Sequence, residues 1–128
     1  MDKFTQAYFE CLCWVGFYYP TEGSEGAPLD DSDAGPLWSD LPEVIQQQIL
    51  SDCGSFQEMA GTLIKGNEKQ AGHDFCLTRN GHGAGFWDGD WPSPDGLELT
   101  RMSKTFGSQT LVAWPGTEEG SYEYDLQS

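Results

Sequence analysis

The chain has 128 residues and a formal net charge of −15, with 38% hydrophobic and 13% aromatic residues. This length suits one domain with a single modest core, and the apolar content excludes a wholly disordered chain. The negative charge disfavours direct contact with nucleic acid or with an anionic membrane. No apolar run is long enough to predict a membrane span, and no signal peptide is indicated.

A first helix is predicted over residues 3–17, because apolar residues recur at helical spacing from Phe4 to Val15. Trp14 widens this apolar stripe, so we expect the helix to be largely buried. Gly16 follows the last apolar residue and is expected to end the helix.

Residues 20–39 are predicted to form a solvated acidic loop, because Gly, Pro and acidic residues dominate them. The segment from residue 4 to residue 64 contains no Lys or Arg. Its acids are predicted either to form a surface that attracts a basic protein or only to keep the protein in solution. The candidate acidic surface comprises Glu22, Glu25, Asp30, Asp31, Asp33, Asp40 and Glu43.

A second, longer helix is predicted to begin near Asp40 and to end near Leu63. Asp40 and Glu43 have the spacing of a capping box, and Pro42 suits a first helical turn. From Ile45 onward an apolar residue recurs every three or four positions, which is typical of a helix with one buried face.

A β-hairpin is predicted within residues 71–90. Residues 74–79 alternate between polar and apolar side chains, and 82–88 supply a second strand. Asn80 and Gly81 between them form the dipeptide that two-residue type I′ turns favour. A short helix over 94–106, a third strand over 110–114 and a flexible tail over 117–128 complete the prediction.

These elements predict an α+β fold in a single domain, residues 1–128. Two N-terminal helices, a β-hairpin, a short helix and a third strand are expected to form a small antiparallel sheet packed on helices.

The hairpin carries the densest group of polar side chains in the sequence. This group could serve acid–base chemistry or bind a ligand if the fold brings its members together, and otherwise its members are turn-forming and surface residues. Their spacing matches no zinc or calcium motif and no phosphate-binding loop, so we expect no metal and no other cofactor. The group comprises His73, Asp74, Arg79, Asn80, His82 and Asp88.

The four cysteines have spacings that fit no small secreted disulfide framework. We therefore expect free, buried thiols and a location in the reducing cytoplasm.

The stretch AGHDFCLTRNGHGAGFWD at 71–88, together with Thr5–Tyr8 and Glu10–Cys11, resembles a family of small proteins encoded by tailed bacteriophages and prophages. The similarity extends over most of residues 4–114. It implies a phage protein in a bacterial host, with the same order of helix, acidic loop, helix and hairpin, and it implies no particular activity.

Three hypotheses about function follow. The first, which we favour, is a phage accessory protein that binds a host protein with a basic surface in the host cytoplasm, as a DNA mimic or counter-defence inhibitor. The second is a small-ligand site or an enzyme built on the 73–88 hairpin. The third is a structural component of the virion. The oligomeric state is not predicted.

Overall fold

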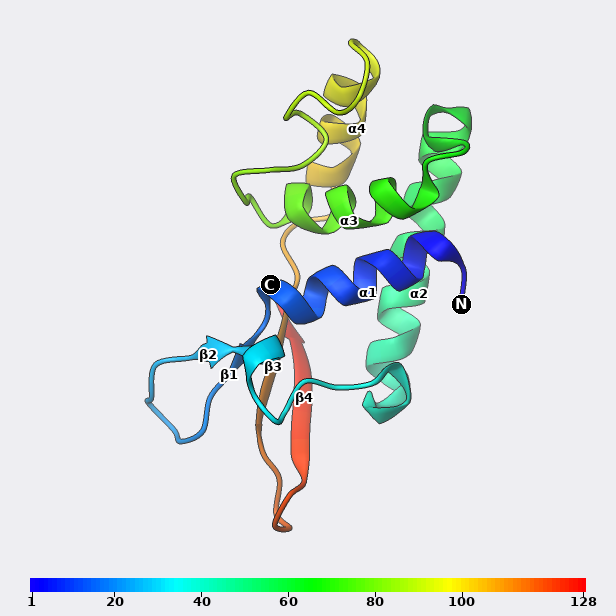
Figure 1. Cartoon of the computed structure of the whole chain (residues 1–128). Coiled ribbons are helices and arrows are strands. Elements are labelled where there is room, and N and C mark those ends of the chain that lie inside the picture. Colours follow the sequence, from blue (N-terminus) through cyan, green and yellow to red (C-terminus); the bar gives the residue numbers. More distant parts are fainter.

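The computed structural model describes all 128 residues and has four α-helices and one four-stranded sheet (Figure 1). The helices α1 and α3 pack side by side, α2 crosses them, and the sheet lies beyond the C-terminal end of α1 (Figure 1). The helices are α1 (Lys3–Val15), α2 (Glu43–Ala60), α3 (Glu68–Arg79) and α4 (Asp95–Lys104), and the strands are β1 (Phe17–Tyr18), β2 (Ala27–Pro28), β3 (Thr110–Pro115) and β4 (Tyr122–Gln127).

The predicted helices α1, α2 and α4 are confirmed. The side chain of Asp2 caps α1 by accepting a hydrogen bond from the N–H of Thr5 at 2.8 Å. The predicted capping box of α2 is absent, because the Asp40 carboxylate accepts instead from the N–H of Leu37, in the turn before the helix.

The predicted hairpin at 71–90 is wrong, because residues 68–79 form the helix α3. Asn80 and Gly81 end this helix instead of turning a hairpin. Gly81 has a φ of 70°, its N–H bonds to the carbonyl of Thr78, and the next N–H bonds to the carbonyl of Leu77. This pair of bonds is the Schellman motif, in which a residue of positive φ closes a helix.

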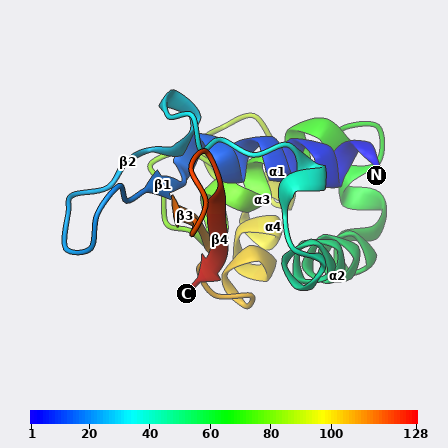
Figure 2. The ribbon, with the colours of Figure 1, turned by 90° about the horizontal axis from the view of Figure 1, so that it is seen from below.

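The sheet is mixed, whereas an antiparallel sheet was predicted. Its strand order is β2-β1-β3-β4 (Figure 2). The central pair β1 and β3 is parallel. The third strand, predicted at 110–114, is confirmed as β3. Much of the expected flexible tail forms β4, which pairs with β3 along six residues.

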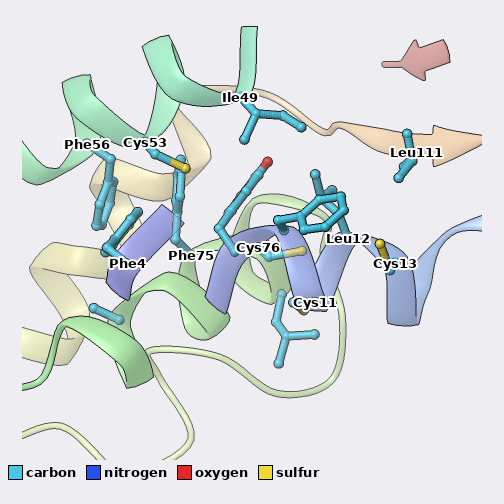
Figure 3. Packing of buried hydrophobic residues seen from close by; sticks show 14 of the residues in the cluster. Phe4, Cys11, Leu12, Cys13, Ile49, Cys53, Phe56, Phe75, Cys76 and Leu111 are labelled. Carbon is cyan, nitrogen blue, oxygen red and sulfur yellow. The ribbon is translucent and has the colours of Figure 1, made fainter. Parts of the chain in front are cut away.

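The core lies between α1, α2 and α3 and is rich in stacked aromatic rings. Phe56 of α2 stacks on Phe75 of α3 with ring centres 4.2 Å apart, and Phe4 of α1 stacks on Phe56 at 5.6 Å (Figure 3). All four cysteines are buried and free, as predicted from their spacing. None of the helices combines the length and the apolar character that crossing a membrane requires.

Candidate functional site

The six polar residues predicted as a functional cluster do not meet in one pocket. Three of them are in the helix α3 and the other three follow it, so the hairpin that would have brought them together does not exist. Arg79 and Asp74 are buried in separate places, His73 is half-buried, His82 is exposed, and the remaining two side chains bond to nearby main chain.

Arg79 lies at the centre of a buried polar group that joins three helices. One of its terminal nitrogens donates to Asp52 of α2 and to the Tyr8 hydroxyl of α1, at 2.9 Å each. Its other nitrogens donate to the carbonyls of Gly107 and Phe106, after α4. Since its side chain is only 3% exposed, these bonds fix the packing of the helices and leave little of the guanidinium for a ligand.

Asp74 also bonds within the protein, and not to Arg79. One of its carboxylate oxygens accepts from the indole N–H of Trp91 at 2.7 Å and from the Gln70 amide at 2.9 Å. Burial raises the pKa of Asp74, and these two hydrogen bonds offset part of that effect. The pair with Trp91 ties the loop before α4 to α3.

Asn80 and Asp88 stabilise local main chain. The Asn80 amide donates to the carbonyl of Cys76, and its oxygen accepts from the N–H of Gln109 at 2.6 Å. The Asp88 carboxylate accepts from the N–H of Gly85 in a tight turn. These hydrogen bonds explain the presence of Asn80 and Asp88 by folding alone.

His73 lies at one end of a groove between α1 and the start of α3, with a volume of about 830 Å³. Its ring stacks on Trp14 with centres 6.0 Å apart. Lysines and glutamates both line this groove, so its charge favours neither an anionic nor a cationic ligand. The lining residues are Lys3, Gln6, Ala7, Glu10, Gly66, Asn67, Glu68, Lys69, Gln70 and His73.

His82 lies in a second groove, which we call the His82 groove, with a volume of about 560 Å³. It brings together one member of the predicted cluster and two acids of the predicted acidic surface. The side chains of Trp14, Phe17 and Leu77 give it apolar walls. The lining residues are Trp14, Val15, Gly16, Phe17, Pro28, Asp30, Asp31, Leu77, His82, Gly83 and Ala84.

The acids of the predicted surface are all exposed in the structure. The protein has two ion pairs, Arg79 with Asp52 and Arg101 with Glu98, and neither involves any of these acids. Partial burial and, after it, the neighbouring carboxylate of Asp31 raise the pKa of Asp30. A cation placed beside Asp30 and Asp31 would relieve this repulsion.

The His82 groove therefore has the chemistry to receive a long cationic side chain. The aliphatic part of a Lys or Arg would pack on Trp14 and Phe17, which are 59% and 41% exposed, and its charged end would reach Asp30 and Asp31. We regard this groove, together with the acidic surface, as the candidate functional site.

Sequence reasoning missed the aromatic walls of this groove. Trp14 was expected to widen the buried stripe of the first helix, but it is largely exposed, and its ring stacks on the half-buried His73 of α3. Trp14 is three residues after the buried Cys11 but four after the exposed Glu10, so it lies at the border between the buried and the exposed side of the helix and the spacing did not decide its burial.

The fold and the candidate site define a small α+β protein with an acidic, partly aromatic groove. Comparison with known protein families, curated proteins and solved structures found no match to the chain. No group of three or more His, Cys, Asp or Glu side chains is arranged to hold a metal ion.

Proposed function

We propose that this protein is a small phage accessory protein that binds a basic surface of a host protein in the host cytoplasm. The observation that carries the proposal is the exposed acidic surface, in which Glu22, Glu25, Asp30, Asp31, Asp33, Asp40 and Glu43 have no basic partner. A surface of this kind speeds encounter with a basic partner and disfavours acidic ones.

The His82 groove supplies what a diffuse acidic surface lacks, namely a place for a specific anchor. Interfaces owe most of their binding energy to a few side chains in well-packed pockets, and Arg is prominent among them. An Arg of the partner would be held by the acids Asp30 and Asp31 and by the faces of exposed aromatic rings. The acidic surface would set the rate at which the partner associates. The groove would set the lifetime of the complex, because it holds the anchoring side chain.

The distribution of acids also supports a finer proposal, that the partner is a nucleic-acid-binding protein and that this protein competes with DNA for it. Basic surfaces on proteins that bind DNA hold rows of phosphates. Exposed carboxylates can occupy the same positions, as expected of a counter-defence inhibitor that acts as a DNA mimic.

The test is affinity capture from a bacterial host lysate at low salt, followed by mass spectrometry. The test variant is Asp30→Asn with Asp31→Asn, and the matched control is Glu58→Gln with Asp90→Asn, which removes the same charge from exposed positions outside both grooves. We expect the wild type and the control to retain a basic partner that the test variant loses, by about tenfold or more in affinity.

Added duplex DNA is expected to displace the captured partner from the wild type. Capture of the same proteins by the wild type and by the Asp30/Asp31 variant would contradict the role of the groove. Capture of acidic proteins alone would contradict the proposal as a whole.

A further inference from the structure

The strand β4 forms an edge of the sheet, and its outer main-chain groups are unpaired. β3 lies on one side of β4, and no strand lies on the other (Figure 2). On β3, the carbonyl of Ala113 accepts from the N–H of Tyr19, so the main chain of Ala113 faces away from β4. Since Ala113 is opposite Tyr124, the alternation of antiparallel pairs turns the main chain of Tyr124 outward.

The same alternation identifies the other outward groups. The N–H and C=O groups of Tyr122, Tyr124 and Leu126 point away from β3, whereas those of Glu123 and Asp125 bond toward it. None of the outward groups bonds to another part of the protein. Natural proteins limit further pairing at such edges with Pro, with bulges or with charged side chains. β4 has no Pro and no bulge, and its two charged residues, Glu123 and Asp125, are both acidic, so they disfavour an acidic strand and not a basic one.

The side chains of β4 indicate which strand would fit. Glu123 and Asp125 are exposed on one face, where Glu123 also accepts from the indole N–H of Trp114 at 2.8 Å. Tyr122, Tyr124 and Leu126 are half-buried on the other face. A complementary strand has basic residues opposite the acids and apolar residues beside the tyrosines, because directly opposed residues share a face of the sheet.

A second copy of this chain fits the edge poorly. In an antiparallel pair of two β4 strands centred on Tyr124, Glu123 of each copy would lie opposite Asp125 of the other. Such like-charge pairs are destabilising. Charge complementarity thus favours a basic strand over self-association.

We propose that the edge of β4 binds a basic, extended segment of a partner protein, which adds to the sheet as a fifth, antiparallel strand. This inference rests on the proposed function for the basic character of the partner and adds the mode of binding. Main-chain hydrogen bonds would supply affinity, and the alternation of acids and tyrosines would supply specificity.

The test uses a synthetic seven-residue peptide of alternating Val and Lys, with amide hydrogen exchange of the protein measured by NMR. In the proposed alignment Val lies opposite the outward residues of β4. We expect the peptide to slow exchange at Tyr122, Tyr124 and Leu126. Exchange at Glu123 and Asp125 should already be slow without peptide, because their N–H groups bond to β3.

Two N-methylated peptides provide the matched control. Methylation of the Val nitrogens removes the donors that face β4 and should weaken binding by about tenfold or more. Methylation of the Lys nitrogens, on the opposite edge of the peptide, should leave the affinity within about twofold, because no hydrogen bond to β4 is lost.

The outcomes separate this inference from the proposed function. Salt-dependent binding of the peptide with unchanged exchange at the three outward residues would overturn strand addition and leave the acidic surface as the binding site. Equal protection by a peptide of alternating Val and Glu would overturn the basic character of the partner. Protection of the same residues in the protein alone, with a dimer in sedimentation, would show that the edge binds a second copy.

Discussion

Arg79 is the residue on which the packing of the helices depends most directly. Its guanidinium is almost completely buried, lies against the rings of Phe75 and Phe106 at 5.3 and 5.6 Å, and donates to Asp52, Tyr8 and two carbonyls. A Lys at this position would keep the charge but could not reach both Asp52 and the carbonyls after α4.

We expect Arg79→Lys to lower the free energy of unfolding by about 3 kcal/mol, because buried acceptors lose their donors. Urea unfolding followed by circular dichroism measures this change. Arg101→Lys is the control, since Arg101 is exposed and pairs only with Glu98 one helical turn away, and it should leave the stability nearly unchanged. Equal stability of the Arg79 variant and the wild type would contradict the structural role of the Arg79 group.

At the scale of elements, the packing of the fold depends on a close approach of α1 and α3. Gly72 of α3 lies directly against the main chain of α1, and a Cβ atom added there would be 2.1 Å from the carbonyl oxygen of Phe4. The helices can pack at this distance only because position 72 has no side chain.

We therefore expect Gly72→Ala to lower the free energy of unfolding by about 3 kcal/mol, since the helices must move apart. Gly54→Ala is the matched control. Gly54 lies inside α2 with no atom near its missing Cβ, so this change should raise the stability by about 0.5–1 kcal/mol through helix propensity. Thermal unfolding of the two variants should give melting temperatures on opposite sides of the wild type.

The helices with one clear apolar face could be predicted from the sequence, and the segment 68–79 could not. Phe75 and Leu77 alternate as in a strand, yet Ala71, Phe75 and Thr78 follow one another by four and three positions, as on one face of a helix, and all of them are buried. Asn80-Gly81 suits both a type I′ turn and the end of a helix. The local signals thus fit a strand and a helix equally well, and the structure has a helix whose Gly72 packs directly on α1.

The last strand had a local signal that acidic composition concealed. Tyr122, Tyr124 and Leu126 alternate with polar residues, which is the period of a half-buried strand, but the surrounding acids favoured a flexible tail. β1 and β2 have two residues each and carry no pattern that could reveal them.

The candidate site was predictable in the same partial way. The exposure of the acids followed from their composition. The groove beside them forms only because the end of α3 brings His82 next to Trp14 and Asp30, which are far away in the sequence.

At the scale of the whole molecule, the dominant property is its charge of −15. Two of the basic side chains are occupied in ion pairs, so most of the acids repel one another without compensation. Salt screens such repulsion, with a Debye length that falls from about 30 Å at 0.01 M to about 8 Å at 0.15 M.

We expect the melting temperature to rise by about 5 °C between 10 and 300 mM NaCl, because screening relieves the repulsion in the folded state. Differential scanning calorimetry measures this shift. A variant with Glu22→Gln, Glu25→Gln and Asp33→Asn, three exposed acids outside the helices and strands, should show a smaller rise. A melting temperature that falls with salt, or the same rise in the variant, would contradict this account.

The pairing of β1 with β3 has a consequence for how the protein is made. Residues 17 and 18 find their parallel partner only at 112 and 113, and the Tyr8 hydroxyl finds Gln109 across 101 positions of chain. A nascent chain leaving the ribosome therefore presents the apolar sides of its first two helices long before the residues that complete the sheet are translated. Until then these surfaces are open to chaperones and proteases, so the sheet can complete its folding only after residues 112 and 113 have been synthesised.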